Sequence, residues 1–319
     1  MKKVLITGGS GFIGSHITKG MLKLGFEVTV FDNNSRGKLS RLDDIKNDIN
    51  FIHGDIRNQA ALVKASQKAN TLVHLAFVNG TQNFYNQANL VLDVALDGLK
   101  SVVEAVKKNN ISDIILASSS EVYQSPDIFP TPEEIAFSIP ELTNPRFSYG
   151  LGKIVQEFYL YHAVEKIENL VIFRPHNIYG NDMGNLHVIP QMFENATKAA
   201  KFNLPLEIQG DGNQTRSFCF IDDFMQAFNL ILTSAERKNI FNIGTREEIS
   251  MLKLMEMVLR ELKLELPITF KELPKGGTLR RLPDISKIER MGFKQKISLS
   301  EGLRIYAQNE ESLREISHN

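Results

Sequence analysis

The sequence has almost no cysteine, since Cys219 is the only one among 319 residues. A single cysteine excludes a disulfide within the chain and is typical of proteins in a reducing compartment. Two lysines follow Met1, but the apolar run behind them is too short for a secretory signal, because Gly8 and Gly9 interrupt it. No stretch is long and apolar enough for a transmembrane helix. We therefore expect a cytoplasmic protein with no membrane partner.

The chain also has no excess of charge of either sign. Lysine plus arginine and aspartate plus glutamate both number 37, so the formal net charge is zero. This balance gives no support for nucleic acid as a bulk partner. The sequence contains no internal repeat and no low-complexity tract. It also has no histidine, cysteine or acidic residues at the spacing of metal ligands, so we expect no metal. What remains is a composition of 42% hydrophobic and 23% charged residues, which is that of a globular protein long enough for two domains.

The most informative stretch is a glycine-rich turn near the start. A short β-branched run at residues 4–6 is followed by Gly8, Gly11 and Gly14, which predicts a strand, a tight turn and a helix start. Backbone N–H groups at such a turn suit a pyrophosphate, although glycine-rich turns also occur without a ligand. We expect this turn, including Phe12 and Ile13, to hold a dinucleotide.

The next strand supports the same interpretation. Residues 27–31 are apolar and end in Asp32, at the distance where a carboxylate accepts hydrogen bonds from a ribose diol. Asn33 and Ser35 lie in a polar loop suited to closing over that ribose. Arg36 could pair with a 2′-phosphate or be a solvated loop charge, whereas Asp32 would repel such a phosphate. We therefore predict NAD rather than NADP.

Further strands alternate with helices. Residues 50–56 and 71–76 are the next two, and Asp55 could meet the adenine amino group, while the small Ala76 allows a cofactor to approach the backbone. We interpret His74 as a strand-end hydrogen-bonding residue rather than a catalyst. The repeating pattern predicts an α/β fold, a Rossmann-type doubly wound parallel sheet with right-handed crossovers.

Shorter elements follow residue 180, so we place a boundary near residue 175. The first domain would span residues 1–175 and a smaller α/β substrate domain residues 176–319. Part of residues 215–245 would pack back on the first domain. Predicted elements of the second domain include a helix at residues 190–201 and a strand near Leu206.

Two predicted helices carry more apolar surface than one sheet can cover. Residues 83–108 have two apolar stripes at helical spacing, and residues 148–166 repeat the feature with Phe158 and Tyr159. A second stripe needs a partner, which predicts a homodimer.

Three clusters carry candidate chemistry. Serines at 118–120 follow a strand at residues 114–117, where open α/β folds bind ligands, although turn and helix-cap chemistry would also explain them. Tyr149 and Lys153 are four residues apart on one helix face, an arrangement that is also common on surfaces. Arg280 and Arg281, in a predicted loop, suit a diphosphate or are simply solvated.

In order along the chain, these features resemble the extended short-chain dehydrogenase/reductase family, specifically its NAD-dependent nucleotide-sugar epimerases and dehydratases. The resemblance rests on residues 7–14, Asp32, 74–76, 118–123, 149–153, 174–180, 209–223 and 281–284.

The resemblance implies roles for single residues. Tyr149 would be the acid/base, Lys153 its partner on the cofactor ribose, and Ser119 the hydroxyl that holds the reacting oxygen. The remaining cofactor contacts would include Ile56, Leu75, Ala76 and Pro175. The remaining substrate contacts would be Ser120, Glu121, Asn177, Arg216 and Arg281, with both arginines on the diphosphate of a nucleoside-diphosphate sugar.

The subtype stays open between several reactions of one family. Residues 174–180 resemble epimerases, and Ser120 stands where many dehydratases have aspartate, so we favour epimerisation at C4 through a 4-keto sugar. A 4,6-dehydratase with Glu121 as base, or a decarboxylase or reductase, is the alternative. A more remote alternative is a non-catalytic NAD-sensing protein. Two departures, Gly152 in place of serine and Ala95 in place of asparagine, leave the catalytic trio intact.

Overall fold

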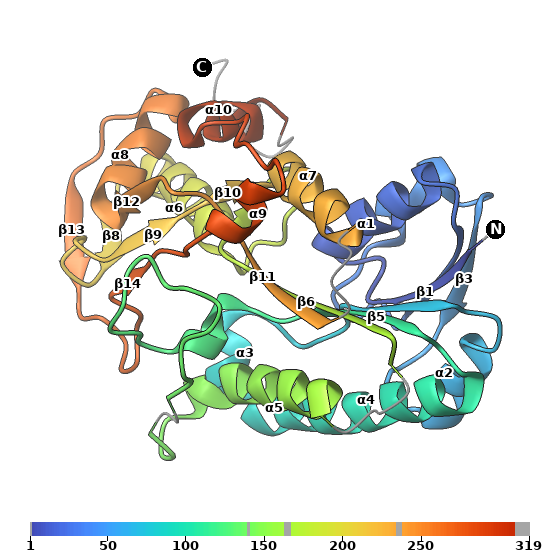
Figure 1. The fold of residues 1–319 in the computed structure, drawn as a ribbon. Coiled ribbons are helices and arrows are strands. Elements are labelled where there is room, and N and C mark those ends of the chain that lie inside the picture. The colour runs from blue at the N-terminus through green and yellow to red at the C-terminus, as the bar shows by residue number, and fades with distance from the viewer. Residues whose placement is uncertain (1, 139–140, 163–166, 234–237, 310–319) are drawn as a thin grey trace. The chain divides into compact units, whose positions relative to one another are not determined.

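The computed structural model describes residues 2–138, 141–162, 167–233 and 238–309 (Figure 1). These residues form two compact units. Unit 1 comprises Met1–Tyr123, Ile139–Pro175 and Ala227–Phe241, and unit 2 comprises Gln124–Ser138, His176–Gln226 and Asn242–Asn319.

A single boundary at residue 175 does not describe this division. Residues 124–138 belong to unit 2 because backbone hydrogen bonds tie them to its last third: the Thr131 N–H donates to the Leu282 carbonyl at 2.8 Å. Residues 227–241 belong to unit 1, where strand β11 joins the edge of the main sheet beside β6.

Unit 1 is built on a seven-stranded sheet with the order β11-β6-β5-β4-β1-β2-β3. The five pairings from β6 to β3 are all parallel, as the alternation of strands and helices predicts, and the expected Rossmann-type fold is confirmed. The strands are β1 (Lys3–Thr7), β2 (Glu27–Asp32), β3 (Ile49–His53), β4 (Thr71–His74), β5 (Asp113–Ala117), β6 (Asn169–Pro175) and β11 (Lys238–Ile243).

Helices cover both faces of this sheet. Figure 1 shows α1 on one face and α4 and α5 on the other. The helices of this unit are α1 (Phe12–Lys23), α2 (Gln59–Ala65), α3 (Thr81–Asn86), α4 (Ala88–Asn109) and α5 (Ser148–His162), with 3₁₀ helices at Leu39–Ile45, Ser120–Tyr123 and Pro145–Phe147. Helix α7 (Ile221–Leu232) contributes its second half.

The helix predicted at residues 83–108 is in fact two helices. Gln87 has φ −138° and ψ 39°, which lies outside the helical region, so α3 ends there and α4 begins at Ala88. The predicted helix at residues 148–166 is described as far as His162, and residues 163–166 lie outside the described part.

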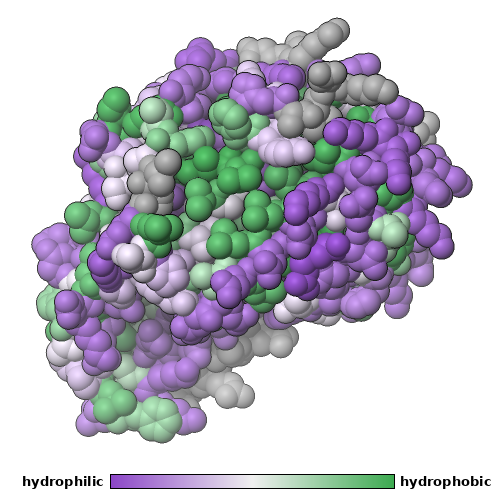
Figure 2. Space-filling model, turned by 90° about the horizontal axis from the view of Figure 1, so that it is seen from below, coloured by the Kyte–Doolittle hydropathy of each residue, from purple (hydrophilic) through white to green (hydrophobic). Residues whose placement is uncertain are grey.

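Both apolar stripes on α4 are largely buried. Val91, Ala95 and Val102 of one are fully buried, and in the other Leu96 is 41% exposed while Val103 is 5% exposed. On α5, Phe158 is 66% and Tyr159 41% exposed. Figure 2 shows hydrophobic side chains gathered on the face that α4 and α5 form.

Unit 2 consists of short strands and four further helices. Its strands are β7 (Ile178–Tyr179), β8 (Leu206–Gln209), β9 (Thr215–Ser217), β10 (Cys219–Phe220), β12 (Glu248–Ser250), β13 (Ile268–Lys271) and β14 (Arg280–Arg281). Its helices are α6 (Val188–Phe202), α8 (Met251–Leu262), α9 (Ser286–Arg290) and α10 (Leu299–Asn309), besides the first half of α7. The prediction of a loop at residues 280–281 is wrong, because these residues pair with β9 as strand β14.

Two features are absent from the described residues. No helix in them is both long and apolar enough to cross a lipid bilayer. Within the same residues, no three histidine, cysteine, aspartate or glutamate side chains gather in a way that could hold a metal ion.

Candidate active site

The glycine-rich turn packs too tightly for side chains. Gly8 has φ +76°, and a Cβ there would lie 2.7 Å from the backbone N of Ala76. At Gly14 a Cβ would lie 2.0 Å from the carbonyl oxygen of Gly8. Glycine is therefore required at both positions, and α1 begins at Phe12, directly behind the turn.

Ser10 joins this turn to the loop behind β2. Its N–H donates to Asp32 Oδ2 at 3.0 Å, and its hydroxyl donates to Asn34 Oδ1 at 2.8 Å. The Ser10 carbonyl accepts from the Lys38 N–H at 3.0 Å. Asp32 is thus buried at the end of β2, where both of its oxygens accept backbone hydrogen bonds, the second one from Asn34 at 2.8 Å.

Arg36 is not a solvated loop charge. It is half-buried, and its guanidinium donates to the carbonyl of Asn79, which follows β4. Burial lowers the pKa of Arg36, while the nearby Tyr149 raises it.

Asp55 has partners of its own. Two nitrogens of Arg57 contact its carboxylate at 3.0 and 2.7 Å, and Asn33 Nδ2 donates to it at 3.2 Å. The Arg57 guanidinium holds the pKa of Asp55 at about 2. Ile56, expected to touch the cofactor, is 4% exposed and packs in the core of unit 1.

The expected cofactor contacts Leu75, Ala76 and Pro175 lie at the ends of β4 and β6. The Leu75 N–H donates to the Thr7 carbonyl at 3.1 Å, which extends the pairing of β4 with β1. Ala76 follows directly and faces Gly8. Pro175, the last residue of β6, is half-buried.

Behind β5, the predicted serine cluster forms a buried turn. The Ser119 hydroxyl accepts from the Glu121 N–H at 3.1 Å, which is the turn chemistry that the sequence left open. Ser120 begins a 3₁₀ helix that packs against α5. The Glu121 carboxylate pairs with Arg146 at 3.2 Å.

Tyr149 lies in an aromatic pocket of unit 1. The Phe84 ring stacks on it with centroids 4.6 Å apart, and the Phe77 ring meets it edge-on at 5.1 Å. The tyrosine side chain is 7% exposed. These contacts fix the plane of the phenol ring.

One turn further along α5, the whole side chain of Lys153 is buried, including its ammonium group. Its Nζ donates to the Ala117 carbonyl at 2.7 Å and lies 4.0 Å from the centroid of Phe77 and 6.0 Å from that of Tyr149. Burial lowers the pKa of Lys153 to about 7, against the opposite effect of Glu157.

A chain of buried polar groups continues from the lysine. Gln156 Oε1 accepts from Lys153 Nζ at 3.4 Å, and Gln156 Nε2 donates to the Ala95 carbonyl at 3.3 Å. His74 Nε2 lies 3.4 Å from Gln156 Nε2, and its Nδ1 lies 2.8 Å from Thr7 Oγ1. The prediction that His74 is a hydrogen-bonding strand residue is confirmed. Burial, with a smaller effect of Lys153, lowers its pKa to about 3, so the ring is neutral near pH 7.

Gly152 explains one of the two departures from the family pattern. A Cβ at this position would lie 2.9 Å from the Cβ of Ala95 and 3.2 Å from Phe77. α5 and α4 therefore approach closely at this point, and the small residues at 152 and 95 depend on each other.

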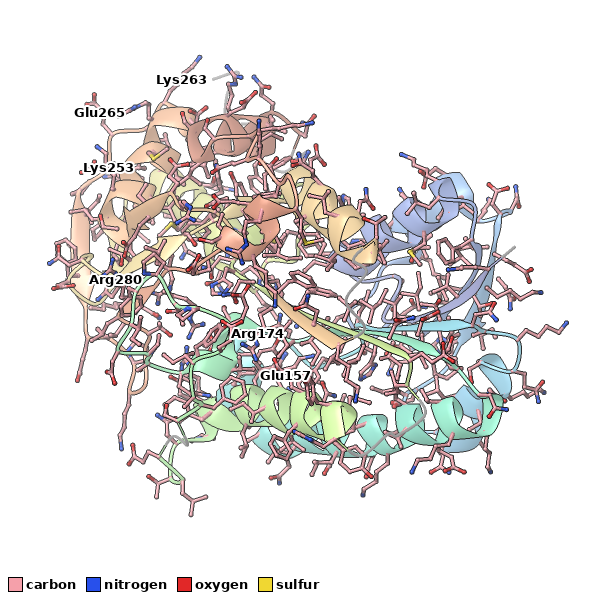
Figure 3. The ribbon with its side chains drawn as sticks, viewed as in Figure 1. Glu157, Arg174, Lys253, Lys263, Glu265 and Arg280 are labelled. Carbon is pink, nitrogen blue, oxygen red and sulfur yellow. The ribbon has the colours of Figure 1, made fainter. Side chains whose placement is uncertain are left out.

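A buried ion pair anchors α5 to β6. Arg174 and Glu157 form two hydrogen bonds, at 2.9 and 2.6 Å, and Figure 3 labels the two side chains beside each other. Arg174 also donates to the Tyr123 hydroxyl at 2.8 Å. Both charged side chains are almost fully buried, so removing either would leave the other uncompensated.

In unit 2, two predicted substrate residues become neighbours. The parallel pairing of β14 with β9 sets Arg281 opposite Arg216. Arg216 donates to the carbonyls of Thr215 and Thr278 at 2.7 and 2.6 Å. Asn177 has φ +42° and donates to the Ser217 carbonyl at 2.8 Å.

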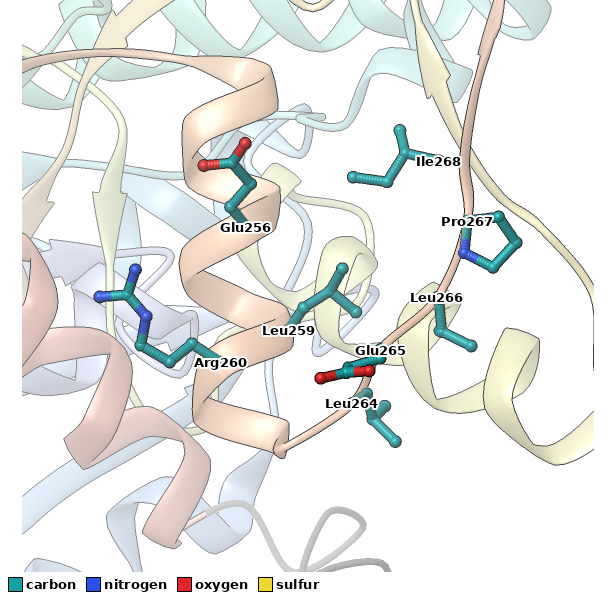
Figure 4. Close-up of a pocket in the computed structure, with 8 residues that line it drawn as sticks. All are labelled: Glu256, Leu259, Arg260, Leu264, Glu265, Leu266, Pro267 and Ile268. Atoms are coloured by element: carbon teal, nitrogen blue, oxygen red, sulfur yellow. The ribbon is translucent and has the colours of Figure 1, made fainter.

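A shallow hollow of about 560 Å³ in unit 2 contains none of these residues (Figure 4). It lies between the end of α8 and the start of β13. Its lining residues are Glu256, Leu259, Arg260, Leu264, Glu265, Leu266, Pro267 and Ile268. We assign the chemistry to the polar groups described above, because the hollow contains no combination of nucleophile, base and orienting group.

The structure adds residues that the sequence analysis did not select. Phe77 and Phe84 pack on Tyr149, and Gln156 contacts Lys153. The contact of Gln156 with Lys153 could have been predicted, because the two residues are three positions apart and positions i and i+3 share a helix face. The two phenylalanines lie in a loop and a short helix, and no periodicity points to them.

Comparison with known proteins agrees with this arrangement. Residues 4–244 match the model of the NAD dependent epimerase/dehydratase family. The chain is 32% identical to a putative UDP-glucose 4-epimerase of Methanocaldococcus jannaschii, over 94% of this chain and 96% of the relative.

Two solved structures show the same fold. The UDP-glucose 4-epimerase of Thermotoga maritima with UDP-glucose has a TM-score of 0.84 at 25% identity, covering 96% of this chain and 98% of that one. DesIV of Streptomyces venezuelae, a dTDP-glucose 4,6-dehydratase with NAD bound, has a TM-score of 0.85 at 25% identity, covering 98% and 99%. The protein is thus an enzyme that belongs to the NAD dependent epimerase/dehydratase family, and its cofactor is NAD.

Proposed function

We propose that this enzyme epimerises a nucleoside-diphosphate sugar at C4 through a bound 4-keto intermediate. The observation that carries the proposal is the placement of Tyr149 and Lys153 on one face of α5, with the ammonium 6.0 Å from the phenol ring centroid. The resemblance over 94% of the chain to a protein named as a putative UDP-glucose 4-epimerase supports the choice of reaction.

The residues around the glycine-rich turn suit NAD. The Gly8 to Gly14 cradle, which a Cβ would fill, brings backbone close to a pyrophosphate, and Asp32 would accept hydrogen bonds from the adenosine ribose. The other expected contacts are Phe12, Ile13, Asn33, Ser35, Asp55, Ile56, Leu75, Ala76 and Pro175. Of these, Asp55 is already engaged by Arg57, so we give it the weakest role.

In this proposal Tyr149 moves the proton. A tyrosine has an ordinary pKa near 10, so a base at pH 7 requires stabilisation of its phenolate by about 4 kcal/mol. The Lys153 ammonium, 6.0 Å from the ring centroid, is a positive group that would supply part of it. Tyr149 takes the proton of the sugar 4-hydroxyl and returns it later, while the Ser119 hydroxyl holds the same oxygen. NAD, when bound, supplies the hydride acceptor for C4 and the donor for the return step.

Glu121 supports epimerisation over dehydration. A 4,6-dehydratase needs a base for the C5 proton, and Glu121 is the candidate. Its carboxylate, however, lies 3.2 Å from the Arg146 guanidinium, and protonating it would break this pair. Glu121 is therefore better suited to holding Arg146 and the turn than to accepting a proton.

The substrate diphosphate fits the paired arginines of unit 2. Two guanidiniums on neighbouring strands can bind phosphate oxygens in a bidentate way. We assign Arg216 and Arg281 to the diphosphate, and Asn177 and Ser120 to further contacts with the substrate.

Two broader features belong to the proposal. The exposed apolar residues on α4 and α5, with Phe158 at 66%, favour a homodimer through this face. The lone cysteine, which is fully buried, favours a reducing compartment such as the cytoplasm.

Solvent isotope incorporation tests the reaction. Wild-type enzyme with NAD is incubated with UDP-glucose in D₂O, and the products are analysed by NMR and mass spectrometry. Epimerisation at C4 returns the hydrogen that it removed, so we expect UDP-galactose without carbon-bound deuterium. Deuterium at C5 with loss of one water would instead establish the dehydratase, and C5 exchange without water loss would indicate epimerisation at C5. A parallel run with dTDP-glucose shows which nucleotide is accepted.

A further inference from the structure

Gln124 combines two unfavourable features at one position. It directly follows the 3₁₀ helix Ser120–Tyr123, and its backbone is left-handed, with φ +54°. Such a conformation is costly for a residue with a long side chain, and glycine would adopt it freely. The side chain is nevertheless only 6% exposed.

The side-chain amide of Gln124 is buried without a partner. Neither Oε1 nor Nε2 has a hydrogen-bond partner among the residues that the structure describes. A buried amide that makes no hydrogen bond destabilises a fold, and folded proteins satisfy most such groups. Strain and an unsatisfied donor and acceptor at one residue point to a ligand that pairs with them.

The surroundings indicate which ligand this is. The Gln124 carbonyl accepts from Arg281 Nη2 at 3.3 Å, and Arg281 stands opposite Arg216 across β14 and β9. The left-handed turn thus places the Gln124 backbone against one of the two arginines assigned to the diphosphate. In a nucleotide sugar the diphosphate is flanked by the sugar on one side and by the nucleoside on the other, so a group beside Arg281 can reach one of these two.

We propose that the Gln124 side chain binds the sugar moiety of the substrate, an inference that rests on the proposed function. A sugar hydroxyl both donates and accepts, so a pair of hydroxyls satisfies Oε1 and Nε2 together. Phosphate oxygens only accept, and a diphosphate would leave Oε1 unpaired. Gln124 is thus a specificity-determining residue for the sugar rather than a further phosphate ligand.

Binding of a nucleotide sugar and of its nucleotide alone tests this assignment. Titration calorimetry of the NAD-loaded enzyme is done with UDP-glucose and with UDP, and again with dTDP-glucose and dTDP. The variant is Gln124→Gly, which removes the amide and suits the left-handed backbone. The matched control is Asn203→Gly, at another left-handed residue (φ +52°), which caps α6 and is exposed.

We expect Gln124→Gly to lower the affinity for the nucleotide sugar roughly ten- to a hundredfold, because two hydrogen bonds are lost. The affinity for the nucleotide alone should change less than about twofold. Its thermal midpoint should equal or exceed that of the wild type, because strain and an unpaired amide are both removed. Asn203→Gly should leave all affinities unchanged. Should Gln124→Gly fail to fold, Gln124→Asn decides in its place, since asparagine tolerates the backbone and withdraws the amide by one methylene.

Three outcomes would overturn the assignment. Unchanged affinity of the variant for the nucleotide sugar would remove Gln124 from the site while leaving the proposed function intact. An equal loss for nucleotide and nucleotide sugar would place Gln124 on the nucleotide. Failure of the wild type to bind either nucleotide sugar would reject the proposed function, and the assignment with it.

Discussion

Lys153 Nζ lies 3.4 Å from Oε1 of Gln156, three residues further along the same helix. The glutamine is fully buried, and its other amide atom donates to the Ala95 carbonyl on α4. The lysine thus has one neutral side-chain partner and one backbone partner, the Ala117 carbonyl. The groups that accept hydrogen bonds from its ammonium are thus neutral dipoles, and burial has the largest effect on the pKa of Lys153.

Replacing Lys153 with methionine should change how stability depends on pH. Burial lowers the pKa of Lys153 to about 7, well below its ordinary value of 10.5. Between these values the unfolded chain binds a proton that the folded protein has released. The wild-type free energy of unfolding should therefore rise from pH 7 to 10 by about 3 kcal/mol relative to Lys153→Met, and the lysine contributes no slope below pH 7.

Urea unfolding of the NAD-free proteins at several pH values measures this difference. Gln156→Glu serves as a second variant, because a carboxylate beside the ammonium should raise the pKa of Lys153 in the folded protein, so that the rise in stability begins at higher pH and is smaller. A difference between wild type and Lys153→Met that is independent of pH would contradict the assignment. Lys153→Met should also bind NAD more weakly.

Tyr149→Phe should retain NAD binding and lose turnover. The substitution deletes one hydroxyl and leaves the ring between Phe84 and Phe77, so packing is preserved. Loss of a general acid/base reduces the rate by about 10²- to 10⁴-fold. Single-turnover assays and NAD titration measure the two properties, and turnover within a factor of three of the wild type would refute the role.

NAD should bind more tightly than NADP. Asp32 at the end of β2 repels a 2′-phosphate, and Arg36 is engaged with the carbonyl of Asn79. Calorimetry with both cofactors measures the preference. Arg36→Leu is the informative control: we expect the preference for NAD to persist in it, and a preference of the wild type for NADP would show that Arg36 outweighs Asp32.

Phe158→Asp should convert a dimer into a monomer. The side chain is 66% exposed on α5, beside Tyr159, and a carboxylate there would oppose burial of this face. Phe202→Asp is a matched control, because Phe202 is 63% exposed at the end of α6. Sedimentation velocity at micromolar concentration gives the answer, and a monomeric wild type would reject the homodimer.

The sequence predicted the six strands of unit 1 from β1 to β6, because parallel strands buried on both faces read as short apolar runs, but it did not predict the edge strand β11. It missed the break at Gln87, since the apolar spacing continues across it and only the backbone angles change. It also read Arg280 and Arg281 as a loop, because a two-residue strand has no periodicity. Such short pairings are decided by tertiary contacts.

In the candidate site, the sequence predicted the placement of residues where that placement follows local spacing. Tyr149 and Lys153 on one helix face are an example. It failed for groups brought together from distant segments. Neither the aromatic contacts of Tyr149 nor the hydrogen bonds between Gln156 and Ala95 can be read from a pattern, because they depend on how closely two helices approach. Gln124 shows the same limit, since its left-handed backbone leaves no mark in the sequence.

The hydrogen bonds of Ser10 have a kinetic consequence. They join the glycine-rich turn to the loop behind β2, and a Cβ at Gly37 would lie 1.8 Å from the Ser10 hydroxyl. These contacts cross-link the turn and the loop that we assign to the adenosine half of NAD, so the protein should lose little conformational entropy when NAD binds. Dissociation must then break a rigid set of contacts at once, so we expect a slow off-rate and NAD that stays with the enzyme through purification.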